Sequence, residues 1–279
     1  MHDATWLTIF GAQIYVEAAG QGTPVLCVHT AGQSGVQYRE VLERLPTHGY
    51  RVVVVDLPGH GRSSPSPSGP ITDLHAYAEY CWEVVRQLSL DRPLVVGCSI
   101  GGKIALDLCV SHGEELRGAV AMEADGHNGA LSVAALRRSM NDAASPSQGE
   151  RTYFGTLASL GRSVPPDRAE RIAAMHRRED SLVTTSDLIG WTTHDVTTAL
   201  AGVQCPLLVV AGRDDFWVRE SDCRAVAESV AHGEFLALDG VGHYPMEERA
   251  DFPELLAGWL EGLVKRGGST AREDGQGYG

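Results

Sequence analysis

Short apolar runs alternate with amphipathic stretches along most of the chain. Pro24–His29, Arg51–Val55 and Leu94–Gly97 show no regular alternation of apolar and polar residues, which predicts strands that are buried on both faces. Asp73–Leu88 and Ile100–His112 carry apolar residues at helical spacing. Strands separated by helices of this length predict an α/β protein with a mostly parallel sheet and helices on both of its faces.

Further elements continue this pattern on both sides of the middle of the chain. Trp6–Phe10 and Gln13–Ala18 predict a hairpin that turns at Gly11. The other predicted strands are Leu116–Met122, Leu207–Ala211 and Glu234–Leu238, and the other predicted helices are Tyr38–Leu45, Arg219–Ser229 and Phe252–Val264. The sheet is therefore expected to contain eight strands.

The segment from about residue 126 to residue 203 interrupts the alternation, because it contains helical patterns and no predicted strand. Its helices are predicted at Leu131–Asn141, Gly149–Leu160, Asp167–Arg177 and Thr185–Trp191. An insertion after the sixth strand would lie over the carboxyl ends of the strands, where open α/β sheets bind ligands. We therefore expect a core domain at 1–125 and 204–266, a helical lid at 126–203, and a small, polar, disordered tail at 267–279.

The composition narrows the class of protein without identifying its chemistry. A formal net charge of −13 and a pI of about 5.2 argue against nucleic acid or an anionic membrane as a partner. No apolar run approaches the roughly 20 residues of a membrane span, and residues 1–5 lack the basic and apolar blocks of a signal peptide. The six cysteines show no metal-binding spacing and predict buried free thiols in a cytoplasmic protein. We expect a monomer or a homodimer that acts on a small-molecule substrate.

Gly97-Cys98-Ser99-Ile100-Gly101 is the most specific chemical signal in the chain. It reads Gly-x-Ser-x-Gly between a predicted strand and a predicted helix, a context that separates a nucleophile elbow from an ordinary glycine-rich turn. Side chains at Gly97 and Gly101 would collide in so tight a turn. The turn lifts the Ser99 hydroxyl clear of the sheet and toward a helix N-terminus, whose N–H groups can stabilise an anion.

A nucleophilic serine needs a general base, and that base needs an orienting carboxylate. His243 follows the last predicted strand in a glycine-rich loop, which lets its imidazole reach back across the edge of the sheet. Asp215 follows the seventh strand and is the favoured carboxylate, whereas Asp214 is expected to stabilise the turn. Asp125, just after the sixth strand, is a third candidate. The chain order Ser99, Asp215, His243 is the one that accompanies a nucleophile elbow.

Taken in order, these landmarks resemble those of the α/β-hydrolase superfamily over nearly the whole chain outside the tail. The matching motifs are His29-Thr30-Ala31-Gly32, Asp56-Leu57-Pro58-Gly59-His60-Gly61-Arg62-Ser63, the elbow at Ser99, the segment Gly212–Asp215, and Gly242-His243. Within the superfamily the chain is similar to the helical-lid group of carboxylesterases, lactone and enol-lactone hydrolases, and carbon–carbon hydrolases of vinylogous ketones. The resemblance is specific for the fold and not for the substrate, because this fold hosts many chemistries.

The resemblance implies an oxyanion hole formed by the backbone N–H groups of Ile100 and, in the loop after the third strand, Ala31. Thr30 stands where the family usually has glycine, so it either alters this loop or offers its hydroxyl to the site. His29 and His60 are expected to be structural. The resemblance implies neither a metal nor an organic cofactor. A serine rather than a carboxylate at the elbow argues against haloalkane dehalogenase or epoxide hydrolase chemistry.

Substrate contacts are the least specific part of this interpretation. Trp191 and Trp217 could line an apolar pocket or belong to the core. Arg177 and Arg178 could clamp a substrate carboxylate or lie on a solvated helix face, and the amine of Lys103 is expected at the surface. The predicted activity is hydrolysis of a small-molecule ester or lactone through an acyl-enzyme on the elbow serine. Carbon–carbon or amide hydrolysis on the same triad, or a non-catalytic ligand receptor, are the alternatives.

Overall fold

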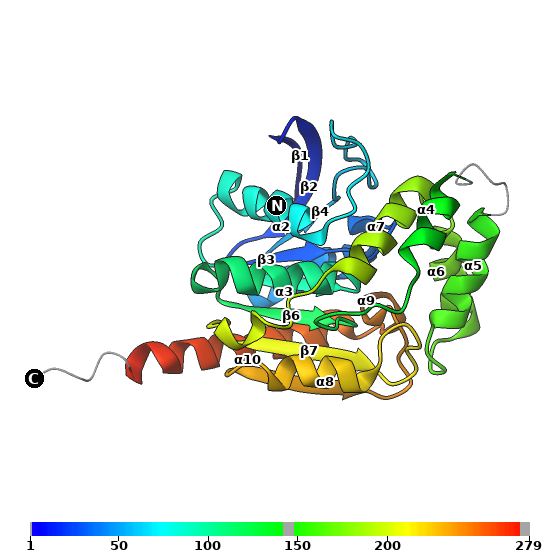
Figure 1. Cartoon of the computed structure of the whole chain (residues 1–279). Coiled ribbons are helices and arrows are strands. Elements are labelled where there is room, and N and C mark those ends of the chain that lie inside the picture. The colour runs from blue at the N-terminus through cyan, green and yellow to red at the C-terminus, as the bar shows by residue number, and fades with distance from the viewer. Residues whose placement is uncertain (1, 142–147, 274–279) are drawn as a thin grey trace, which may run out of the picture.

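The computed structural model of the protein describes residues 2–141 and 148–273 of the 279-residue chain. Its centre is one eight-stranded sheet in the order β1-β2-β4-β3-β5-β6-β7-β8 (Figure 1). The strands are β1 His2–Ile9, β2 Ala12–Gly20, β3 Thr23–Val28, β4 Tyr50–Val55, β5 Leu94–Cys98, β6 Gly118–Met122, β7 Leu207–Gly212 and β8 Gly233–Leu238. β2 pairs in antiparallel fashion with both of its neighbours, β1 and β4, and the other neighbouring strands pair in parallel. The predicted fold class and the eight-stranded, mostly parallel sheet are confirmed.

The first two strands form the predicted hairpin, although both are longer than predicted. β1 pairs with β2 over its whole length. Most side chains of β1 are exposed, so its first half carries no apolar signal in the sequence. The connecting turn uses positive φ angles at Phe10 and Gly11, as a tight hairpin between twisted strands requires.

Helices cover both faces of the sheet, and alternate residues of a strand point into two different apolar cores. In β3, Leu26 and Val28 face one core and Val25 and Cys27 face the other. The first core lies under α2, α3 and α8, and the second under α1 and α10. These helices are α1 Arg39–Arg44, α2 Leu74–Gln87, α3 Ile100–His112, α8 Glu220–Glu228 and α10 Phe252–Glu273. Burial on both faces explains the continuous apolar runs of the strands.

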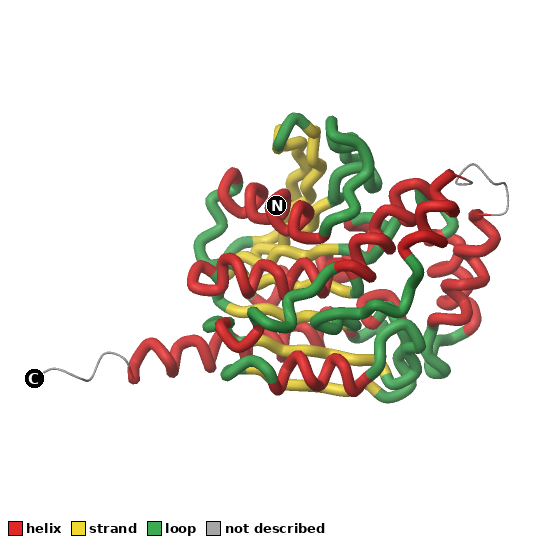
Figure 2. Tube along the Cα trace, in the orientation of Figure 1, coloured by secondary structure: helices red, strands yellow, loops and turns green. Residues whose placement is uncertain are grey.

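Between β6 and β7 the described part of the chain contains four α-helices and no strand. They are α4 Val133–Asn141, α5 Gln148–Ser159, α6 Pro166–His176 and α7 Ser181–Thr193. Figure 1 shows them beyond the end of the sheet toward which the arrows of β6 and β7 point, and Figure 2 shows this group of helices set to one side of the strands. We call residues 126–203 the cap. It lies at the end of the sheet where open α/β folds bind ligands.

The tail that was expected to be disordered from residue 267 is in part helical. α10 continues to Glu273, and Figure 1 shows its last turns projecting away from the sheet. Glycine costs a helix about 1 kcal/mol without forbidding it, so Gly267 and Gly268 do not end α10. The helix thus includes residues 267–273 of the expected tail, and residues 274–279 lie outside the described part of the chain.

The cysteines are in the state that the sequence predicts. All six cysteines are free and buried, as predicted.

Along residues 2–141 and 148–273, no helix combines the length and the apolar character that crossing a membrane would require.

Candidate active site

β5 ends in the sharp turn expected of a nucleophile elbow. Ser99 adopts φ 57° and ψ −118°, a sparsely populated conformation that costs a residue with a side chain of order 1–3 kcal/mol. A Cβ atom on Gly97 would lie 1.9 Å from the carbonyl oxygen of Gly101, and one on Gly101 would lie 2.3 Å from that of Val28. Both glycines of the motif are thus required by the close approach of neighbouring backbone.

The Ser99 side chain lines a cavity of about 220 Å³ whose wall combines core and cap residues. Ala31 and His243 belong to the core part of this wall. Most of the other lining residues come from the cap, including Leu188 and Trp191. The cap therefore shapes most of the space in front of the serine.

The structure brings His243 and Asp215 together. Nδ1 of His243 lies 2.7 Å from Oδ2 of Asp215, and both side chains are buried. The other oxygen of Asp215 accepts the backbone N–H of Trp217 at 2.8 Å. Burial alone would raise the pKa of Asp215, but His243 and the hydrogen bonds outweigh it and hold this pKa below its usual value. An ionised Asp215 keeps the proton on Nδ1 of His243 and leaves Nε2 available as a base.

The loop that carries His243 packs against the end of α5. The His243 N–H donates to the carbonyl oxygen of Ser159 at 2.9 Å, and a Cβ atom on Gly242 would lie 2.1 Å from the same oxygen. Ser159 Oγ also accepts the indole N–H of Trp217 at 2.8 Å. Among the described residues no hydrogen bond joins Ser99 to the His243 ring, as is common before a substrate binds. The cap thus helps to place the candidate base.

The two alternative carboxylates have other partners. Asp214 accepts the backbone N–H of Arg162 at 2.7 Å and pairs with its guanidinium, so it ties the loop after β7 to the cap rather than to its own turn. Asp125 pairs with Nζ of Lys103 at 2.5 Å, and both side chains are almost fully buried. The expected surface position of the Lys103 amine was wrong, because Asp125 supplies a buried counter-charge. Burial lowers the pKa of Lys103, and Asp125 opposes this effect.

Glu123 lies beside the candidate acid, although no motif in the sequence singles it out. It follows β6 with a positive φ of 47°, has no exposed surface, and accepts the N–H of Gly212 at 2.6 Å. Burial and the neighbouring charge of Asp215 raise the pKa of Glu123 well above its usual value. The raised pKa favours the neutral form of Glu123 beside the ionised form of Asp215. The one feature of the sequence that could have pointed to Glu123 is its position directly after β6, the strand that pairs with β7.

In the loop that follows β3, residues 30–33 contain a single backbone N–H, that of Ala31, for which the described part of the chain provides no acceptor. The other three N–H groups of this loop have acceptors. That of Thr30 donates to Gln37 Oε1 at 2.9 Å, that of Gly32 to Asp187 Oδ2 at 2.8 Å, and that of Gln33 to the Thr30 carbonyl oxygen at 3.2 Å. Ala31 lines the cavity that holds Ser99. The geometry therefore singles out Ala31 as the donor that this loop can offer to a substrate.

The second expected donor is also available. Ile100 is the first residue of α3, where the N–H groups of a helix have no partner within the helix. The Thr30 hydroxyl, by contrast, donates to Gln37 Oε1 at 3.1 Å. Of the two roles open to Thr30, the structure favours fixing the loop over offering its hydroxyl to a substrate.

The residues expected to contact substrate fall into two groups. Thr30, Trp191 and Trp217 line the cavity that holds Ser99. Trp191 is almost fully buried, so it belongs to the core as well as to the cavity wall.

The two arginines lie elsewhere. Arg177 pairs with Glu150 at 2.6 Å on the surface of the cap, and Arg178 lines two neighbouring cavities that do not contain the serine. α6 buries Ile172 and His176, so the arginines that follow face away from the cavity. The structure does not bring the expected arginine clamp to the site.

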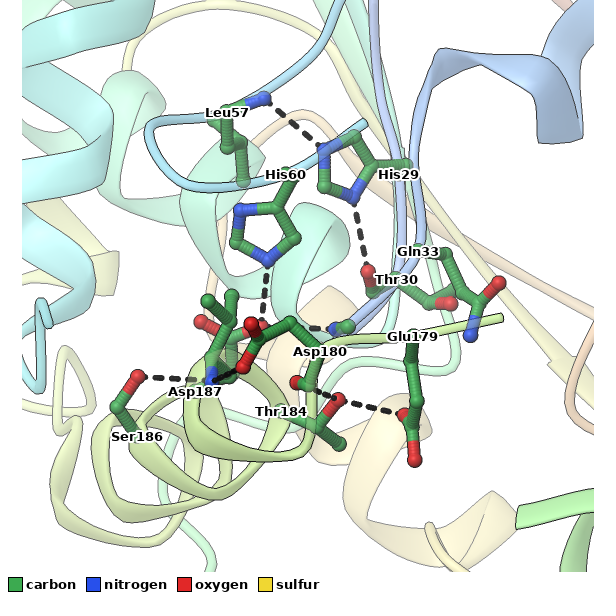
Figure 3. Close-up of polar contacts among 12 residues, drawn as sticks. His29, Thr30, Gln33, Leu57, His60, Glu179, Asp180, Thr184, Ser186 and Asp187 are labelled. Atoms are coloured by element: carbon green, nitrogen blue, oxygen red, sulfur yellow. Dashed lines mark hydrogen bonds and ion pairs between the residues drawn. The ribbon is translucent and has the colours of Figure 1, made fainter. Parts of the chain in front are cut away.

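Polar cap residues without a motif form part of the same cavity wall. Glu179 accepts a hydrogen bond from the hydroxyl of Thr184 at 2.5 Å (Figure 3). It also accepts one from the hydroxyl of Thr152. Burial raises the pKa of Glu179. His176 pairs with Glu247 at 2.7 Å. The cavity therefore has a hydrogen-bonding wall in addition to its aromatic residues.

These parts suit acyl transfer. A strained serine, an imidazole held by an ionised carboxylate, and two free N–H groups surround one cavity. Within residues 2–141 and 148–273, no group of three or more His, Cys, Asp or Glu side chains is arranged to hold a metal ion. The fold and this arrangement define a hydrolase with a candidate serine nucleophile.

Comparison with known proteins identifies the family. The model of the alpha/beta hydrolase fold family matches residues 23–250, and the chain belongs to this family of hydrolytic enzymes. A pimeloyl-[acyl-carrier protein] methyl ester esterase from Yersinia pseudotuberculosis is 25% identical over 265 residues, which cover 89% of this chain and 98% of that protein. A putative non-heme haloperoxidase from Mycobacterium phage D29 is 26% identical over 170 residues, which cover 61% of this chain and 56% of that protein.

A solved structure supports the same fold. That of a thermophilic esterase from Thermogutta terrifontis, with malate bound, superimposes with a TM-score of 0.82 and covers 96% of this chain and 99% of its own. Its sequence is 21% identical, so this likeness concerns the fold alone.

Proposed function

We propose that the protein hydrolyses a small-molecule carboxylic ester or lactone through an acyl-enzyme on Ser99. The observation that carries the proposal is the convergence of Ser99, His243 and the free N–H group of Ala31 on one cavity. The short contact between His243 and Asp215 adds the orienting carboxylate that such a base needs. The similarity to a methyl ester esterase over nearly all of that relative supports the ester class.

The proposed reaction uses groups of this chain at each step. Ser99 Oγ attacks the carbonyl carbon while Nε2 of His243 takes the hydroxyl proton. The N–H groups of Ala31 and Ile100 stabilise the negative charge that forms on the carbonyl oxygen. His243 then protonates the leaving alkoxide, and Asp215 stabilises the imidazolium meanwhile. Water, activated by the same base, attacks the acyl-enzyme, releases the acid and regenerates the serine.

The size of the cavity favours a short acyl group. About 220 Å³ lies below the roughly 300–1,000 Å³ of typical small-molecule sites. Leu188 and Trp217 provide apolar contact, while Glu179 provides a hydrogen-bonding group. A substrate with a short acyl chain and one polar substituent fits this wall better than a long fatty acyl chain.

The test compares the wild-type protein with Ser99→Ala in hydrolysis of p-nitrophenyl acetate and p-nitrophenyl butyrate. We expect the substitution to lower the rate at least roughly 10³-fold, with an unchanged circular dichroism spectrum and melting temperature. Turnover by Ser99→Ala near that of the wild type would remove the serine mechanism. Absence of turnover by the wild type would shift the test to vinylogous diketones, for a carbon–carbon hydrolase, and then to binding alone, for a receptor.

A further inference from the structure

The N–H group of Ala31 is held in place through both of its neighbours. On one side, Gln37 accepts the N–H of Thr30; on the other, Asp187 accepts the N–H of Gly32 at 2.8 Å. Gln37 belongs to the core, whereas Asp187 lies on α7 in the cap. A cap carboxylate is therefore bonded directly to the loop that carries the candidate oxyanion donor.

The orientation of the Ala31 N–H follows from the peptide to which it belongs. The carbonyl group of the same peptide is that of Thr30, and it accepts Nδ1–H of His29 at 2.8 Å (Figure 3) and the N–H of Gln33 at 3.2 Å. In a trans peptide the C=O and N–H bonds point in opposite directions. Fixing the carbonyl group toward His29 therefore turns the N–H of Ala31 to the opposite side, toward the cavity.

Asp187 is fully buried and accepts hydrogen bonds from three separate segments. Besides Gly32, these donors are Nε2 of His60 and the hydroxyl of Tyr77, each at 2.8 Å. Figure 3 shows His60 and Asp187 facing each other across the interface of cap and core. The carboxylate joins α7, α2 and both loops at the carboxyl ends of β3 and β4.

The partners of His60 favour an ion pair with Asp187. Nδ1 of His60 faces the Pro58 carbonyl oxygen at 3.1 Å and Nε2 faces Asp187, so a ring protonated on both nitrogens satisfies both acceptors. Burial alone would lower the pKa of His60, but Asp187 outweighs it and raises this pKa. Together with the hydrogen bonds from Gly32 and Tyr77, this buried contact links α7 to the two loops and to α2.

The same loop has no free space on its cap side. Gly32 has a φ of +67°, and a Cβ atom there would lie 2.0 Å from Oγ1 of Thr184 and 2.6 Å from Oε2 of Glu179. Thr184 precedes Asp187 by one turn on α7. The conformation at Gly32 is thus set by direct contact with the cap, in addition to the hydrogen bond that its N–H donates to Asp187.

We propose that Asp187 is a positioning residue for the oxyanion hole, through which the cap aims the N–H of Ala31 at the reacting carbonyl group. This inference rests on the proposed serine hydrolase function. It gives the cap a part in the rate of reaction, separate from its part in shaping the cavity.

The test compares Asp187→Ala with Asp187→Asn in hydrolysis of p-nitrophenyl acetate. Alanine removes the acceptor for the Gly32 N–H, while asparagine keeps one amide oxygen that can accept it. An oxyanion donor acts in the transition state, so its loss lowers kcat and leaves KM nearly unchanged. We expect Asp187→Ala to lose about 30-fold or more in kcat, approaching the roughly 10²–10³-fold loss for removal of one donor. Asp187→Asn should lose about threefold to tenfold, because a neutral acceptor bonds less strongly than a carboxylate.

Phenylboronic acid supplies a second readout. Ser99 Oγ adds to the boron atom, its proton goes to His243, and a hydroxyl oxygen of the tetrahedral boronate occupies the oxyanion site. The inhibition constant of Asp187→Ala should rise by about the factor by which kcat falls. Asp180→Asn is the matched control, because it makes the same change at the N-cap of α7, where asparagine caps as well as aspartate. This control should keep the wild-type kcat and inhibition constant.

Circular dichroism and melting temperature establish that each variant is folded. If Asp187→Ala does not fold, Asp187→Asn tests the positioning role, which predicts the smaller loss of kcat at unchanged KM. A folded variant at Asp187 with wild-type kcat and inhibition constant would overturn the positioning role and leave the proposed function intact. Wild-type turnover that survives Ser99→Ala would overturn the proposed function, and this inference with it.

Discussion

Asp214 and Asp215 are adjacent in the chain, but the turn after β7 directs their carboxylates to different partners. Asp215 is buried and meets Nδ1 of His243 at 2.7 Å, whereas Asp214 meets Arg162 of the cap. Asparagine at position 215 keeps the size of the side chain and removes the charge that holds the imidazole tautomer. We expect Asp215→Asn to lower kcat roughly 10³–10⁴-fold, and Asp214→Asn by less than about threefold. Steady-state hydrolysis of p-nitrophenyl acetate measures both, and the reverse ranking would assign the acid to Asp214.

At the scale of elements, a buried ion pair joins α3 to the end of β6. Nζ of Lys103 lies 2.5 Å from Asp125, and neither side chain has appreciable contact with solvent. Lys103→Met leaves the aspartate without its counter-charge, which in buried pairs destabilises the folded state by about 3–5 kcal/mol. Adding Asp125→Asn removes that charge, so the double variant should regain at least half of the free energy of unfolding that Lys103→Met loses. Urea unfolding followed by tryptophan fluorescence measures both. A loss below about 1 kcal/mol in Lys103→Met would show that Asp125 is not ionised in the fold.

The sequence predicts those elements whose physical cause is local. Continuous apolar runs identify the buried strands, and the Gly97 and Gly101 spacing identifies the elbow, because the collisions that require glycine arise within one turn. Contacts between distant segments have no such signal. The placement of Glu123 beside Asp215, and of Asp187 against Gly32, depends on how β6 and the cap pack onto the rest of the molecule. For the same reason periodicity predicts the helices of the cap without showing which of their faces line the cavity.

At the scale of the whole molecule, stability should fall as the pH decreases from about 6.5 toward 4. His29 is fully buried; its Nε2 accepts the N–H of Leu57 at 3.0 Å and its Nδ1–H donates to Thr30. Burial, together with the neighbouring His60, lowers the pKa of His29 to about 4, from about 6.5 in the unfolded chain. Between these values the unfolded chain binds a proton that the folded protein does not. The stability present above pH 6.5 is therefore lost progressively as the pH falls to 4, by about 3 kcal/mol from this group.

Replacement of His29 tests this origin of the pH dependence. The raised pKa of His60 acts in the opposite direction, because its contribution is present at low pH and is lost as the pH rises through the folded-state value. The variant His29→Asn keeps the contribution of His60 to the pH dependence of stability and lacks the contribution of His29. The free energy of unfolding of the variant should be lower at pH 7, where the hydrogen bonds of the imidazole are lost, and should change less between pH 6.5 and pH 4.5. Urea titrations of both proteins at pH 7.0, 5.5 and 4.5 measure this, and parallel curves would mean that His29 does not set the acid sensitivity of the fold.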